Sequence, residues 1–188
     1  IMKSYYAQDG ASFYAIGIPM LESVKLLKSG GMEREAEELL RYYEIHGEML
    51  IKNGLCYPPH EVKYEQSIVA PAVNYLFQLY ELTGKILYLE EGKKQLAVLV
   101  LFNGHQPDFH MYENAVRHWD GYWFGKYKNL GDTFPHYWSS LSGVAFREYE
   151  KITGERSYGV KAENSLRGVL SMINSDGSAS CAYVYPFM

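Results

Sequence analysis

The sequence predicts an all-α domain built from helical hairpins that stand side by side in two layers. Two observations support this prediction. A helix–turn–helix segment recurs with an offset of 70 residues, and helices that are apolar nearly all round alternate with helices that have one charged face. A repeated unit that cannot bury its apolar face alone must stack against its neighbours. The whole chain, residues 1–188, is expected to form one such domain.

The repeat is clearest around two Thr-Gly pairs. Segments 80–96 and 149–166 align on this shared pair. Its glycines, Gly84 and Gly154, suit the left-handed residue that often ends a helix. The sequence Ser-Gly-Gly at 29–31 looks like a weaker third copy, so three hairpin turns are predicted.

Six helices follow from the hydrophobic periodicity. They are expected near 12–28, 34–53, 67–83, 88–103, 135–153 and 158–173. The helix at 67–83 is apolar nearly all round, which is typical of a buried helix. The helices at 34–53 and 88–103 have a charged face and an apolar face, as expected of an outer layer. A buried helix, a tight turn and an amphipathic helix form one hairpin of a two-layer ring.

The connections alternate in length. Turns from a buried to an amphipathic helix are short, whereas those leading back, 54–66 and 104–134, are long. In an up-and-down array these long connections and the tail from 174 meet at one end. Long connections in compact domains are often functional. We therefore expect the site at the N-terminal ends of the inner helices.

Composition limits the classes of function. Apolar residues make up 47% and charged residues 21%, so the chain is neither disordered nor membrane-spanning. A net charge of −4 argues against nucleic-acid binding. Cys56 and Cys181 do not make a disulfide framework. The aromatic fraction of 15% is high, and aromatic side chains form platforms for ring-shaped ligands.

The connection at 105–138 concentrates the residues that carry chemistry. It holds four of the six His and all three Trp. Indoles stack on sugar rings, while carboxylate, His and Arg groups bind hydroxyls or a uronate. The predicted partner is a carbohydrate substrate, with no cofactor and no metal. The predicted substrate-binding residues are His110, Arg117, Trp119, Tyr122, Trp123, Lys126, Tyr137 and Trp138.

Each of these residues also has a structural interpretation. The three Trp side chains could simply pack the connection onto the helices. Asp132 or Thr133 could be the N-cap of a helix that starts at Pro135, and Asp120 before a glycine could be a turn residue. Glu65 could be a surface carboxylate beside a helix that Ser67 caps. The spacing of His105, Asp108 and His110 matches no strong metal-binding motif.

The chain resembles the six-hairpin glycosidase superfamily, the α/α toroids of glycoside hydrolases and polysaccharide lyases. The resemblance rests on the LTG and ITG turns, on YEQSIVAPAV at 64–73, and on HWDGYWFGK and GDTFPHYWS at 118–126 and 131–139. It implies an α/α toroid with an aromatic-lined cleft and action on glycosidic bonds. About three of the six hairpins are present, so an incomplete barrel is expected.

Three functions remain open. The leading one is glycoside hydrolysis, which needs two carboxyl groups, and Asp120, Asp132 and Glu65 are the candidates. The alternative is a polysaccharide lyase acting on a uronate-containing glycan. Its acid and base would come from His118, His136, Tyr122 and Tyr137, with Arg117 or Lys126 on the substrate carboxylate. The third is a non-catalytic glycan-binding or scaffold module.

Both ends of the sequence look internal, because the chain starts at Ile1 and ends at Met188 without a polar tail. We therefore expect the chain to be a piece of a longer protein, and the piece alone need not be active. The missing hairpins would come from the same chain or from a homo-oligomer. No leader is visible, so either a cytoplasmic or a secreted bacterial location is compatible.

Overall fold

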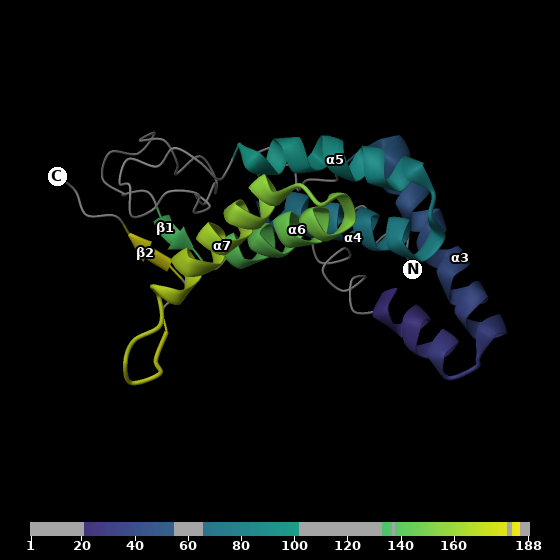
Figure 1. Cartoon of the computed structure of the whole chain (residues 1–188), viewed down its shortest axis with the longest axis horizontal. Helices are drawn as coiled ribbons and strands as arrows, with labels where there is room; N and C mark the ends of the chain where they lie inside the picture. Colours follow the sequence, from purple (N-terminus) through teal and green to yellow (C-terminus); the bar gives the residue numbers. More distant parts are fainter. Residues whose placement is uncertain (1–20, 55–65, 102–132, 137, 180–181, 185–188) are drawn as a thin grey trace.

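The computed structural model describes residues 21–54, 66–101, 133–136, 138–179 and 182–184 (Figure 1). A helix at 21–29 is followed by α3 (Glu33–Asn53), α4 (Gln66–Thr83), α5 (Ile86–Val100), β1 (Thr133–His136), α6 (Trp138–Thr153), α7 (Arg156–Leu170) and β2 (Ala182–Val184). All six predicted helices are confirmed within the described residues. No helix in these ranges is long and apolar enough to span a lipid bilayer.

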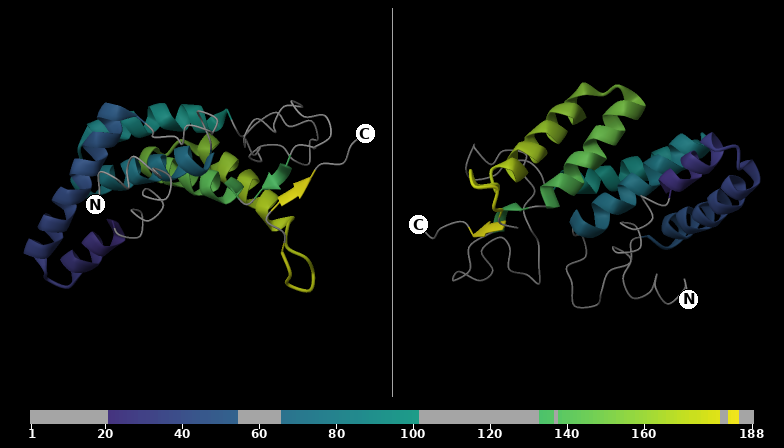
Figure 2. Two further views of the ribbon diagram at one scale, coloured as in Figure 1. Left: turned by 180° about the vertical axis from the view of Figure 1, so that it is seen from behind. Right: turned by 90° about the horizontal axis from the view of Figure 1, so that it is seen from below.

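The helices form three hairpins that lie side by side (Figure 2). The helix at 21–29 pairs with α3, α4 pairs with α5, and α6 pairs with α7. The α4–α5 hairpin lies in the middle, since α4 contacts α3 on one side and α6 on the other. This is the predicted two-layer arrangement, in which α4 and α6 are inner helices and α5 and α7 are outer helices.

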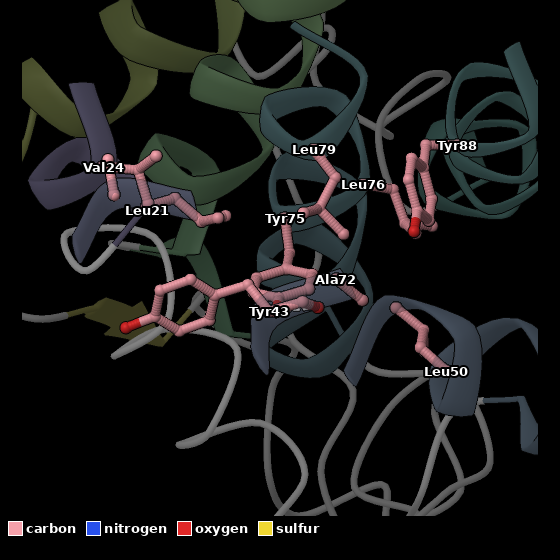
Figure 3. Packing of buried hydrophobic residues seen from close by; sticks show 10 residues of the cluster. Leu21, Val24, Tyr43, Leu50, Ala72, Tyr75, Leu76, Leu79 and Tyr88 are labelled. Atoms are coloured by element: carbon pink, nitrogen blue, oxygen red, sulfur yellow. Dashed lines mark hydrogen bonds between the residues drawn. The ribbon is translucent and has the colours of Figure 1, made fainter. Parts of the chain in front are cut away.

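The central helix α4 is buried because both neighbouring hairpins pack against it. Every residue from 69 to 79 is buried. On one side Tyr75 and Leu79 pack with Leu21 and Val24 of the first hairpin (Figure 3). On the other side Phe77 packs with residues of α6, including Phe146 and Tyr149. An apolar sequence all round the helix is therefore explained by two separate core clusters that share it.

Each of the three hairpin turns contains a glycine in the left-handed conformation. Gly84 and Gly154 have φ of 68° and 75°, the left-handed conformation that glycine adopts without strain. Their amides donate to the carbonyls of Tyr80 and Glu150, both at 2.7 Å. The weaker third copy is confirmed as well, since Gly31 has φ of 75°. These bonds satisfy carbonyls that the end of a helix would leave unpaired.

The expected start of the helix at 135–153 was wrong. Residues 133–136 form β1, and α6 begins at Trp138. Pairing with β2 keeps residues 133–136 in extended backbone, so the helix begins after them. Because no helix starts at Pro135, neither Asp132 nor Thr133 is the N-cap of such a helix. The predicted cap Ser67 was also wrong, because α4 already includes Gln66.

Two short strands and an isolated bridge between Ile173 and Ala179 depart from an all-helical fold in the described residues. β1 pairs antiparallel with β2, with Thr133 opposite Val184 and His136 opposite Ala182. The register shifts between these pairs, in the interval that contains Pro135, which has no amide hydrogen to donate. This pairing attaches the segment after α7 to the segment before α6.

Candidate functional site

The inner helices α4 and α6 run parallel, so their N-terminal ends lie at the same end of the molecule. Phe77 of α4 and Tyr149 of α6 lie equally far from the starts of their helices, and their rings are 5.6 Å apart. The long connections lead into these two N-termini, after Gly54 and after Leu101. The prediction that the connections reach one common end is supported by this geometry.

The small sheet lies at that same end. β1 leads directly into α6 and contacts α7, whose C-terminus leads toward β2 (Figure 1). The pairing of His136 with Ala182 therefore brings the tail to the start of an inner helix. Two residues of the predicted site, His136 and Trp138, are placed here by their backbone.

The other predicted site residues lie outside the described residues. They are Glu65, His110, Arg117, His118, Trp119, Asp120, Tyr122, Trp123, Lys126, Asp132 and Tyr137. Their roles therefore stay predictions. The part of the chain that the structure describes contains no group of three or more His, Cys, Asp or Glu that could hold a metal ion.

Buried polar groups inside the inner helices were missed by the sequence analysis. Asn74 and Gln78 of α4 are 3% and 8% exposed, and Ser142 of α6 is fully buried. Asn74 Oδ1, Gln78 Oε1 and Ser142 Oγ have no hydrogen-bond partner among the residues that the structure describes. Leaving such a group unpaired costs about 1–3 kcal/mol, so their presence in apolar helices is unusual. The available signal was two amides spaced four residues apart within an otherwise apolar helix.

Several titratable groups within the hairpins have pKa values shifted by burial. Burial lowers the pKa of His46 in α3. Burial, together with Glu44 and Glu48, raises the pKa of Tyr88. Burial also raises the pKa of Tyr149 and of Tyr158, with Glu155 adding to both.

Comparison with known proteins found a similar solved structure. No protein-family model matches the sequence, and no curated protein does. A solved structure of Polysaccharide Lyase BACCELL_00875 matches 99% of this chain with 51% sequence identity and a TM-score of 0.79. The match covers 28% of the solved chain. At this identity and coverage, the described helices belong to an α/α toroid, of which this chain supplies an incomplete part.

Proposed function

We propose that this chain is part of a polysaccharide lyase that cleaves a uronate-containing glycan by β-elimination. The observation that carries the proposal is the 51% identity to a polysaccharide lyase through 99% of the chain. The chain spans about 28% of that protein's length, so the activity is proposed for the full-length protein. This match favours elimination, the predicted alternative, over the hydrolysis that was the leading prediction.

Elimination makes three demands on the protein. A base removes the proton at C5 of the uronate, the electron pair forms the C4–C5 double bond, and the C4–O bond breaks. An acid then protonates the departing oxygen, so that no water is consumed. A positive group must also stabilise the negative charge that develops on the carboxylate during proton removal.

The end of the molecule at which α4 and α6 begin suits an anionic substrate. The N-terminus of a helix carries partial positive charge and unpaired amides, and α4 and α6 both begin here. We assign the substrate carboxylate to this end, with Arg117 or Lys126 as its further partner. Trp119, Trp123 and Trp138 are assigned to stack on sugar rings.

The acid and base are assigned from the imidazoles and phenols of the same segment. His136 lies two residues before α6, and its backbone pairs with β2, which supports it as the first candidate. His118, Tyr122 and Tyr137 are the remaining candidates. The carboxylates Asp120, Asp132 and Glu65 are not needed for proton transfer in this reaction.

The test uses the full-length protein with a panel of uronate polysaccharides. A lyase produces a conjugated double bond that absorbs in the ultraviolet, together with new reducing ends. We expect His136→Ala to lower kcat by about 10²–10⁴-fold if His136 transfers a proton. Arg167→Ala, at an exposed position of α7, is the control and should leave kcat unchanged.

The other outcomes identify the alternatives. New reducing ends without ultraviolet absorbance, abolished by Asp120→Asn, would show a hydrolase instead. Oligosaccharide binding measured by tryptophan fluorescence without any product would show a binding module. Either result would overturn the lyase proposal.

A further inference from the structure

One face of α4 carries both buried amides. Asn74 and Gln78 are four residues apart, so they lie one above the other on the same side of the helix. Leu76 marks the opposite side, because its Cβ is 3.4 Å from the point where a Cβ on Gly92 of α5 would stand. Each amide is two positions from Leu76, about 160° around the helix. The two amides therefore point away from the outer helix α5.

The equivalent positions of α6, in the α6–α7 hairpin, also face away from their outer helix. With the 70-residue offset, Phe146 corresponds to Leu76, and its ring lies 5.9 Å from that of Tyr158 in the outer helix α7. The residues two positions to either side are Val144 and Glu148, which correspond to Asn74 and Gln78. Val144 is 46% exposed. The same face of both inner helices is thus directed away from the outer layer.

The two hairpins differ in what this face contains. On α6 the face carries Val144 and an ion pair between Glu148 and Lys151, at 2.6 Å. On α4 it carries two amides that are more than nine-tenths buried. Within the part of the chain that the structure describes, Asn74 Oδ1 and Gln78 Oε1 accept no hydrogen bond. Repetition of the hairpin therefore does not explain the amides, whose unpaired atoms have been withdrawn from water.

We propose that Asn74 and Gln78 are saccharide-binding residues that hydrogen-bond hydroxyl groups of the glycan from the inner face of α4. A primary amide can both donate to and accept from a hydroxyl group, which matches the chemistry of a sugar edge. Ligand sites typically combine apolar surroundings with a few placed polar groups, and these two amides are polar groups in a mostly apolar helix. The inference rests on the proposed lyase function and adds a binding position that is separate from the acid and base.

The test compares steady-state kinetics and melting temperature in the full-length protein. Asn74→Leu keeps the branched shape and removes the polar atoms, and Gln78→Met does the same for the longer side chain. Each variant should raise KM by about tenfold, the effect of one lost hydrogen bond, while kcat changes little. Because an unpaired polar group is removed, the melting temperature should hold or rise.

Ser142→Ala is the matched control. Its hydroxyl is also buried and has no hydrogen-bond partner in the described ranges, but Ser142 lies on the side of α6 that includes Ala145 and Tyr149. This variant should raise the melting temperature and leave KM unchanged. If KM in Asn74→Leu and Gln78→Met follows that control, the amides do not bind substrate. A fall in melting temperature with unchanged KM would show an internal structural partner and would also overturn the inference.

Activity of the wild-type protein distinguishes failure of the binding role of Asn74 and Gln78 from failure of the lyase proposal. A wild type that eliminates uronate glycans while the amide variants keep their KM refutes only the binding role. A wild type that produces no unsaturated product from any uronate glycan refutes the lyase proposal, and the binding role with it.

Discussion

Thr83 and Thr153, which lie 70 residues apart, end their helices with the same pair of hydrogen bonds. Each hydroxyl donates to the carbonyl four residues earlier, at 2.6 Å and 2.8 Å respectively. Each hydroxyl oxygen also accepts the amide two residues later, at 3.2 Å in both cases. The glycine that follows each threonine then reverses the chain. The sequence repeat thus corresponds to the same hydrogen bonds in both turns, which indicates that the hairpin is the repeated structural unit.

The threonine hydroxyls should stabilise both turns. Thr83→Ala and Thr153→Ala each lose two hydrogen bonds at a helix end, so we expect the free energy of unfolding to fall by about 1 kcal/mol in each. Urea denaturation of the purified protein measures this. Thr83→Ser and Thr153→Ser keep the hydroxyl and serve as controls. Equal stability of the Ala and Ser variants would contradict the assignment.

Gly92 allows α4 and α5 to approach closely. A Cβ at this position would lie 2.6 Å from Cε1 and 2.8 Å from Cδ1 of Phe77, whose ring is fully buried. Alanine favours a helix by about 1 kcal/mol over glycine, but overpacking costs about 1–3 kcal/mol. We expect Gly92→Ala to lower the free energy of unfolding on balance.

The cause of that loss is tested by a double-mutant cycle. In a Phe77→Leu background the smaller side chain makes room, so Gly92→Ala should become neutral or stabilising. A loss of the same size in both backgrounds would show that the Phe77 ring is not the obstacle.

Tyr75 joins the central helix to the first hairpin. Its side chain is fully buried, and its hydroxyl donates to the backbone carbonyl of Tyr43 at 2.8 Å. Tyr75→Phe removes the hydroxyl that donates this bond, and we expect a loss of about 1 kcal/mol in chemical denaturation. Tyr42→Phe, at a side chain that is 42% exposed, is the control and should have no measurable effect. Indistinguishable results for the two variants would argue against the bond.

His46 should make stability depend on pH. Burial lowers its pKa in the folded state, so between that value and the ordinary one near 6.5 the unfolded chain binds more protons. The contribution of His46 to stability is therefore complete above about pH 6.5 and is lost as the pH falls below it. Denaturation curves at about pH 8 and pH 5 measure the difference. His46→Gln should reduce this difference, and an unchanged difference would assign it to other groups.

Local sequence signals predicted the hairpins because the responsible interactions are local. A glycine that adopts positive φ and a threonine that bonds within one turn act over a few residues, so the turns at 29–31, 84 and 154 could be located. The buried nature of α4 followed from its apolar sequence. The first residues of α4 and α6 were harder to predict from sequence. The start of α6 lies at 138 rather than 135 because residues 133–136 pair with β2. The catalytic assignments, including Asp120 and Glu65, stay predictions.

The sequence by itself determined that this chain forms three helical hairpins with a buried central helix, since periodicity and turn residues act within each hairpin. Only the tertiary structure decided that β2 pairs with β1, that α4 and α6 are parallel neighbours, and that Asn74 and Gln78 face away from the outer layer. These relationships join residues that are tens of positions apart in the chain. They depend on how the hairpins pack, and no single segment encodes that packing.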